Sequence, residues 1–89
     1  MNDSTVVRQA PTVELRMEGQ RWVIQDDVET RKLNDVGATI WSLCNGRRSI
    51  GEIADRITVE FEVSAEIAQR DCREFVLDLV DQGFLLPVE

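Results

Sequence analysis

The stretch KLNDVGATIWSLCNGRR, residues 32–48, decides how the chain is organised, because the spacing of its apolar residues changes there. Before Asn34, apolar residues alternate with polar ones, which is typical of strands with one buried face. After Asn34, they recur with helical spacing. Asn34 suits the start of a helix, because its side chain can accept free amide hydrogens of the first turn. Gly46 suits the left-handed position after a helix end.

Three short strands are expected before this junction. Residues 13–18 and 21–25 alternate apolar and polar side chains, and turn-forming residues follow each run. A third strand is expected over residues 28–33, although its sequence is rich in charge. Because the connections are short, the pattern favours an antiparallel meander.

Three helices are expected after the junction, of which the first follows Asn34. Ser49 and Glu52 form a capping box that begins the second, which then repeats apolar residues with helical spacing. The third is expected over residues 65–82, beginning after Ser64 and ending at Gly83.

The expected fold class is α+β, with a three-stranded antiparallel sheet followed by a three-helix bundle of winged helix-turn-helix type. Residues 1–11 are expected to form a flexible N-terminal tail. A single domain is expected over residues 12–86, with the sheet in residues 12–33 and the helices in residues 34–86. Residues 87–89 would be the C-terminal end.

The composition argues against catalytic and metal-binding sites. The 89 residues include no histidine, which is the usual general base at neutral pH and the commonest metal ligand. Cys44 and Cys72 fall on apolar helix faces and are too few for a structural zinc site, so we expect buried, reduced thiols. We therefore predict no enzyme activity, no catalytic residue, no metal site and no cofactor.

The charge balance disfavours nucleic-acid binding. The net charge is −7, and the acidic excess lies in the second half of the chain. A winged-helix DNA-binding regulator stays open as an alternative, but it would need a basic third helix. The residues expected on the exposed side of that helix are mostly acidic: Glu66, Arg70, Arg73, Glu74, Leu77, Asp78 and Asp81.

No segment suggests a membrane. No apolar run approaches the ~20 residues that span a bilayer. Residues 1–11 lack the basic start and apolar core of a signal peptide. The prediction is therefore a cytoplasmic location without membrane or nucleic-acid partners.

Two segments resemble the PqqD family. The first is LNDVGATIWSLCNGRRSIGEIADRITVEF, residues 33–61, with Leu-Asn before the first helix, Ile-Trp within it, and Asn-Gly followed by Arg-Ser and Glu-Ile. The second is RDCREFVLDLVDQGFL, residues 70–85, which is similar to the family's third helix. The resemblance covers roughly residues 12–86.

This resemblance implies a peptide-recognition element of ribosomally synthesised and post-translationally modified peptide (RiPP) pathways. Such elements bind the leader of a precursor peptide as an added strand and present it to a modifying enzyme. That partner would be a radical-SAM protein or a RiPP protease or cyclase, in pyrroloquinoline-quinone (PQQ), lasso-peptide or another pathway. The peptide-binding residues implied are Val28, Glu29, Thr30, Arg31, Lys32 and Leu33 on the third strand, with Arg70, Arg73, Glu74 and Leu77 on the third helix.

One further alternative stays open. The free edge of a three-stranded meander can pair with another copy of the chain as well as with a peptide. An assembly subunit that forms a homodimer by strand exchange would therefore use the same edge.

Overall fold

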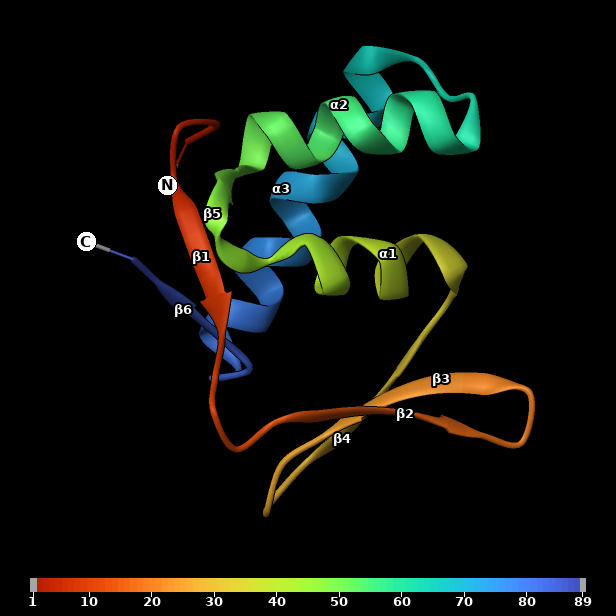
Figure 1. Cartoon of the computed structure of the whole chain (residues 1–89), viewed down its shortest axis with the longest axis vertical. Helices are drawn as coiled ribbons and strands as arrows, with labels where there is room; N and C mark the ends of the chain where they lie inside the picture. Colours follow the sequence, from red (N-terminus) through yellow and green to blue (C-terminus); the bar gives the residue numbers. More distant parts are fainter. Residues whose placement is uncertain (1, 89) are drawn as a thin grey trace.

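The structure is a computed structural model that describes residues 2–88. It contains three helices and the expected three-stranded antiparallel sheet, so the predicted fold class is confirmed. Figure 1 shows the β2-β3-β4 sheet on one side of the helices. The elements in chain order are β1 (Val6–Gln9), β2 (Glu14–Glu18), β3 (Arg21–Gln25), β4 (Thr30–Leu33), α1 (Asp35–Leu43), β5 (Asn45–Ser49), α2 (Ile50–Phe61), α3 (Ala65–Asp81) and β6 (Leu85–Pro87).

The register of the β2-β3-β4 sheet defines the face that it turns toward the helices. Ile24 pairs with Leu15 on one side and with Arg31 on the other, and Trp22 pairs with Leu33. Because side chains alternate along each strand, these residues share one face of the sheet. Ile24 and Leu33 belong to the buried core, so Arg31 is the charged residue that β4 adds to the core face.

A second three-stranded sheet, in the order β5-β1-β6, corrects the predicted flexible tail. β1 lies between β5 and β6, beside the chain termini in Figure 1, and Val7 within it is completely buried. The prediction of a tail over residues 1–11 is therefore wrong for residues 6–9. The segment is short, and its pairing partners lie far away in the sequence, so no local pattern revealed it.

β5 also changes the expected role of Gly46. α1 ends at Leu43, and Gly46 lies within β5 with a φ of +82°. The register between β1 and β5 shifts there, because Val6 pairs with Ser49 while Arg8 pairs with Asn45. The left-handed conformation is thus present, but it forms an irregularity in a strand instead of ending the helix.

The predicted beginnings of all three helices are confirmed. The side chains of Asn34, Ser49 and Ser64 each accept a backbone N–H from the first turn of the helix that follows. The capping box is complete, because Glu52 also accepts the N–H of Ser49. Gly83 has a φ of +82°, as expected after the end of α3.

The core lies between the helices and both sheets. Trp41 is 1% exposed, and Cys44 and Cys72 are completely buried as free thiols. Burial raises the pKa of Cys44 to about 12, and the neighbouring Cys72 adds to this effect. Both cysteines therefore pack as small apolar residues.

Within residues 2–88, no helix is long and apolar enough to cross a membrane. The same residues contain no group of three or more histidine, cysteine, aspartate or glutamate side chains that could hold a metal ion.

Candidate functional site

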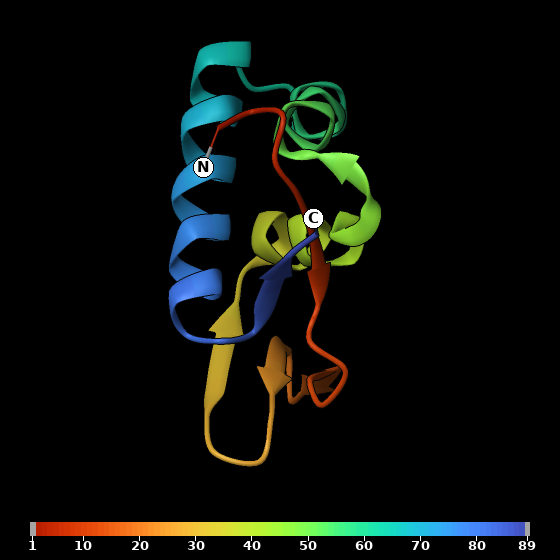
Figure 2. The ribbon, with the colours of Figure 1, turned by 90° about the vertical axis from the view of Figure 1, so that its left-hand side faces the viewer.

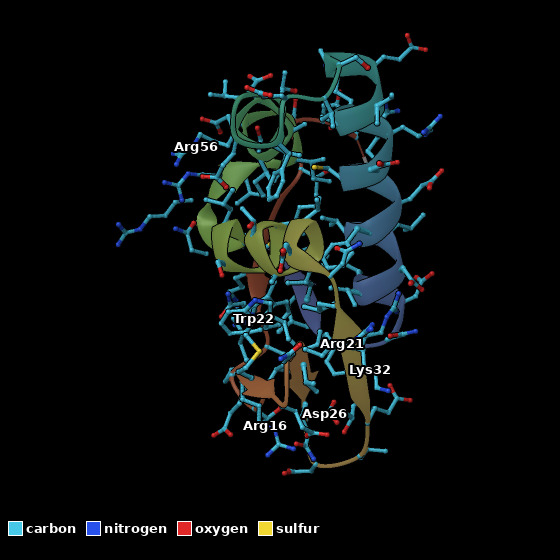
Figure 3. The ribbon with its side chains drawn as sticks, turned by 90° about the vertical axis from the view of Figure 1, so that its right-hand side faces the viewer. Arg16, Arg21, Trp22, Asp26, Lys32 and Arg56 are labelled. Carbon is cyan, nitrogen blue, oxygen red and sulfur yellow. The ribbon has the colours of Figure 1, made fainter. Side chains whose placement is uncertain are left out.

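The outer edge of β4 is the first component of the site. In the order β2-β3-β4, β4 has a strand neighbour on one side only within the described chain. Figure 2 shows β4 beside the C-terminal half of α3, and Figure 3 labels Lys32 on this strand. An edge strand presents unpaired N–H and C=O groups along its length. Residues 30–33 therefore offer backbone groups to an extended segment that lies beside α3.

Arg31 connects β4 to α3. Its guanidinium forms an ion pair with the carboxylate of Asp78 and donates a hydrogen bond of 2.8 Å to Oε1 of Gln82. The side chains of Arg31 and Asp78 are 32% and 47% exposed. An ion pair with this exposure contributes about 0–1 kcal/mol. The connection can therefore be rearranged at little cost.

A groove of about 400 Å³ lies between the end of β4, the start of α1 and α3. Its apolar part comes from both helices, and its charged part comes from Arg31 and α3. We call this cavity the β4–α3 groove. Its lining residues are Arg31, Asn34, Val36, Gly37, Ile40, Asp71, Glu74, Phe75 and Asp78.

The inner end of the groove depends on a close approach between α1 and α3. Asn34 Oδ1 accepts the N–H of Gly37 at 2.7 Å and so fixes the first turn of α1. A Cβ atom placed on Gly37 would lie 3.1 Å from Cε1 of Phe75, closer than ordinary packing permits. Glycine at this position therefore lets the Phe75 ring lie against α1.

Three carboxylates line the α3 side of the groove. Asp71, Glu74 and Asp78 follow one another at intervals of three and four residues, which places them along one flank of the helix. Arg31 is the one cationic residue among the described residues that line the groove. The groove therefore has an excess of negative charge, which also disfavours α3 as a helix that binds DNA phosphates.

β4 is shorter than the predicted strand over residues 28–33. Val28 and Glu29 lie in the turn that precedes it, where Oδ1 of Asp26 accepts their N–H groups at 2.8 and 2.7 Å. These hydrogen bonds, that of Glu29 foremost, lower the pKa of Asp26. Val28 is 88% exposed. Of the six predicted strand residues, only Thr30, Arg31, Lys32 and Leu33 form the edge.

The four predicted α3 residues separate into different surroundings. Glu74 lines the groove together with Arg31. Arg73 forms an ion pair of 3.3 Å with Asp3 of the N-terminal segment, away from the groove lining. Leu77 is 49% exposed and does not line the groove. Arg70 forms an ion pair of 3.5 Å with Asp71.

Sequence reasoning missed most of the groove lining. Of these residues, the implied peptide-binding set contains only Arg31 and Glu74, and Asp78 was expected only on the exposed side of the third helix. A helical projection shows Asp71, Glu74 and Asp78 on the flank next to Phe75, which is the signal that could have grouped them. The projection cannot show which flank faces β4, because that depends on how α3 packs.

Trp22 occupies a different hollow from the β4–α3 groove. It is only partly buried, and Figure 3 shows it labelled between α1 and the hairpin that β2 and β3 form. This second hollow, of about 340 Å³, is lined by Leu15, Trp22, Asp35, Ala38, Thr39, Ser42 and Leu43. Trp22 thus packs at the margin of the core, whereas Trp41 lies fully inside it.

The fold and the groove define a class of small winged-helix-like domain that has an open strand edge beside its third helix. The family model for coenzyme PQQ synthesis protein D (PqqD) matches residues 21–85. This chain belongs to the PqqD family.

Individual relatives agree with this assignment. A PqqA binding protein from Bradyrhizobium diazoefficiens is 30% identical over 64 residues, which cover 72% of this chain and 62% of the relative. This chain therefore matches less than two thirds of that relative's length.

Two solved structures share the fold. A lasso peptide synthetase B1 complexed with the leader peptide is 29% identical, with a TM-score of 0.78 and coverage of 91% of this chain and 98% of that one. The PqqD truncation of Methylobacterium extorquens PqqCD, described as a functional and stand-alone RiPP recognition element, has a TM-score of 0.83. It is 22% identical and covers 97% of this chain and 94% of its own, so it shows the shared fold.

Proposed function

We propose that this protein is a non-catalytic domain that binds the leader segment of a ribosomal precursor peptide. The leader adds as a strand to the edge of β4 and lies in the β4–α3 groove. The observation that supports this most directly is the open edge of β4 beside a groove of about 400 Å³. A related protein of the same fold is complexed with a leader peptide, and another relative is named for binding PqqA.

The physical basis is β-augmentation. Backbone groups of residues 30–33 pair with the leader and supply affinity for any extended chain, while pockets for alternate side chains supply selectivity. A short paired strand with one or two filled pockets corresponds to about −8 to −10 kcal/mol, which is micromolar to submicromolar binding.

The bound leader would be presented to a modifying enzyme. We propose a radical-SAM protein or a RiPP protease or cyclase as that partner, in a PQQ-type or lasso-peptide pathway. The domain would act in the cytoplasm, where ribosomal precursors are made. In this proposal its contribution to the reaction is to hold the substrate, because the groove lining contains no histidine, cysteine or serine to act as a nucleophile or a neutral-pH base.

An NMR titration tests the proposal. ¹⁵N-labelled protein is titrated with a synthetic leader of the precursor peptide encoded nearest to it. We expect the largest amide shifts at residues 30–33 and at the groove residues Gly37, Glu74 and Phe75. Binding that leaves residues 30–33 unshifted would contradict strand addition.

Two modified leaders provide a matched control for backbone pairing. One is N-methylated at its odd-numbered residues and the other at its even-numbered residues. Only alternate N–H groups of the leader would point toward β4, and the others would point away from it. Methylation of the N–H groups that point toward β4 should therefore abolish binding, and methylation of the others should preserve it. Equal loss from both sets, or loss from neither, would be inconsistent with pairing to a strand edge. Light scattering of the free protein separates this function from assembly, because a dimer that uses the β4 edge would block the leader.

A further inference from the structure

We infer that the β4–α3 groove selects a leader strand bearing a cationic and an apolar side chain two residues apart, both directed toward α3. This inference rests on the proposed function and names the chemistry of the peptide that the site accepts. It is drawn from the register of the β2-β3-β4 sheet and from the charges around the groove.

The register determines which side chains of an added strand face the groove. Arg31 and Leu33 lie on the core face of β4, with Lys32 between them on the opposite face. A strand paired to β4 continues this alternation, so its own inward side chains lie beside Arg31 and Leu33. These two inward positions are separated by one outward residue.

The two inward positions meet different surroundings on α3 and α1. Arg31 contacts Asp78 and Gln82, near the C-terminal end of the helix. Asn34, which directly follows β4, lines the groove together with Gly37 and Phe75, and the Phe75 ring lies against Gly37. The position beside Arg31 therefore faces polar and acidic groups, while the position beside Leu33 faces the apolar part of the groove. That apolar part consists of Val36, Ile40 and Phe75.

The charges around the groove favour a cation at the first position. Three carboxylates face a single guanidinium, and Arg31 already pairs with Asp78. Glu74 forms no ion pair with any residue in the range 2–88. The ion pair of Asp71 with Arg70 is long, at 3.5 Å, and both side chains are exposed. Neighbouring carboxylates three and four residues apart on a helix repel one another. A lysine or arginine on the leader relieves this repulsion, whereas an acidic side chain increases it.

Arg31 does not remove this preference. Its ion pair with Asp78 is solvent-accessible and therefore weak, so Asp78 can exchange partners when a leader enters. If Arg31 stays paired with Asp78, Glu74 and Asp71 remain available to the incoming cation. In both arrangements the occupied groove has more nearly balanced charge than the empty groove.

A display selection tests the inference with peptides of random sequence, so the natural leader need not be identified. A library of random dodecapeptides is selected for binding to the full chain, and the selected peptides are mapped on ¹⁵N-labelled protein. We expect lysine or arginine to be enriched two positions from an aliphatic or aromatic residue, in peptides that shift residues 30–33. Replacing that cation with glutamate should weaken binding by about tenfold.

Two charge-reversal variants identify the groove as the origin of the preference. Glu74→Lys should abolish the enrichment of cations, because it places a positive charge in the lining. Asp81→Lys makes the same change in charge on an exposed part of α3 outside the lining, and it should preserve the enrichment. Circular dichroism of both variants checks that they are folded, as expected for exposed positions.

The outcomes separate the inference from the proposed function. Peptides that shift residues 30–33 but show no excess of cations, or that keep their excess with Glu74→Lys, overturn the inference and leave strand addition intact. Peptides that bind without shifting residues 30–33, or a selection that yields no binder, overturn both.

Discussion

At the scale of single residues, the contact between Gly37 and Phe75 links the packing of the protein to the shape of its groove. The Phe75 ring is partly buried and lines the groove, and it occupies space that a side chain at position 37 would need. The packing of the core and the shape of the β4–α3 groove thus depend on the same atoms. The two residues lie 38 positions apart in the sequence, so no local pattern could show that they touch.

Gly37→Ala should weaken leader binding and change the free energy of unfolding only modestly. Alanine favours the helix by about 1 kcal/mol relative to glycine, while the crowding of Phe75 costs about 1–3 kcal/mol. These effects partly cancel, so we expect the free energy of unfolding to change by no more than about 2 kcal/mol. The displaced ring should narrow the groove and reduce affinity on the order of fivefold, which corresponds to about 1 kcal/mol. Urea denaturation and calorimetric titration measure the two quantities.

Thr39→Ala is the matched control for this change. It also raises helix propensity in α1, but Thr39 lines the hollow on the hairpin side and not the β4–α3 groove. Its leader affinity should equal that of the wild type. An unchanged affinity for Gly37→Ala would show that Phe75 can move without narrowing the groove.

At the scale of secondary-structure elements, local chemistry accounts for where each helix begins. Asn34, Ser49 and Ser64 all satisfy backbone N–H groups that would otherwise lack partners. These interactions join residues that are close in sequence, so the spacing of side chains was sufficient to predict them. The third strand was overestimated because the Asp26 turn takes up Val28 and Glu29, which the pattern alone had placed in the strand.

The capping box of α2 should make stability depend on acid pH. The N–H of Ser49 hydrogen-bonds the Glu52 carboxylate and lowers its pKa from the ordinary value of 4.5. A carboxyl with a lowered pKa stabilises the fold above its unfolded pKa, and the contribution is lost as the pH falls through the folded pKa. Glu52→Gln should therefore be less stable than the wild type at neutral pH, with the difference vanishing below the folded pKa. Urea denaturation at a series of pH values, from neutral to below the folded pKa, measures this difference in the free energy of unfolding.

The Glu60→Gln variant is the control, because Glu60 lies at the other end of α2 and takes no part in the capping box. A difference between Glu52→Gln and wild type that stays constant with pH would mean that the carboxylate charge does not contribute to the cap. Ser49→Ala should cost about 1 kcal/mol at neutral pH through loss of the hydroxyl acceptor.

At the scale of the whole molecule, β1 pairs with one strand from the middle of the chain and with another near its C-terminal end. Val6 and Arg8 pair with β5, and the strand also pairs with β6 near the C-terminus. The carbonyl of Val6 accepts the N–H of Val88 at 2.8 Å. The N-terminal segment is thus part of the folded body and not a tail ahead of it.

Val7→Ala should destabilise the protein although Val7 lies in the segment expected to be flexible. Val7 is completely buried, and removing two methyl groups from a core position costs about 2 kcal/mol. Arg8→Ala, at the exposed neighbouring position, should change stability by no more than about 0.5 kcal/mol. Equal, small effects in urea denaturation would mean that β1 contributes little to stability in solution.

The order of residues along the chain was enough to establish the α+β class, the three helices with their capping residues, the two buried cysteines and the antiparallel meander. All of these depend on residues that are close along the chain, where periodicity and capping chemistry act directly. The family resemblance also directed attention to the third strand and third helix.

How distant segments meet became visible only in the folded chain. The burial of Val7 between two remote strands, the contact of Arg31 with Asp78 and Gln82, and the approach of Phe75 to Gly37 all depend on the packing angle of α3 and on long-range strand pairing. The same acidic residues of α3 would be ordinary solvated charges if the helix were rotated. Packing of its apolar stripe against the core turns Asp71, Glu74 and Asp78 toward the open edge of β4, because burying that stripe leaves the helix only one favourable orientation.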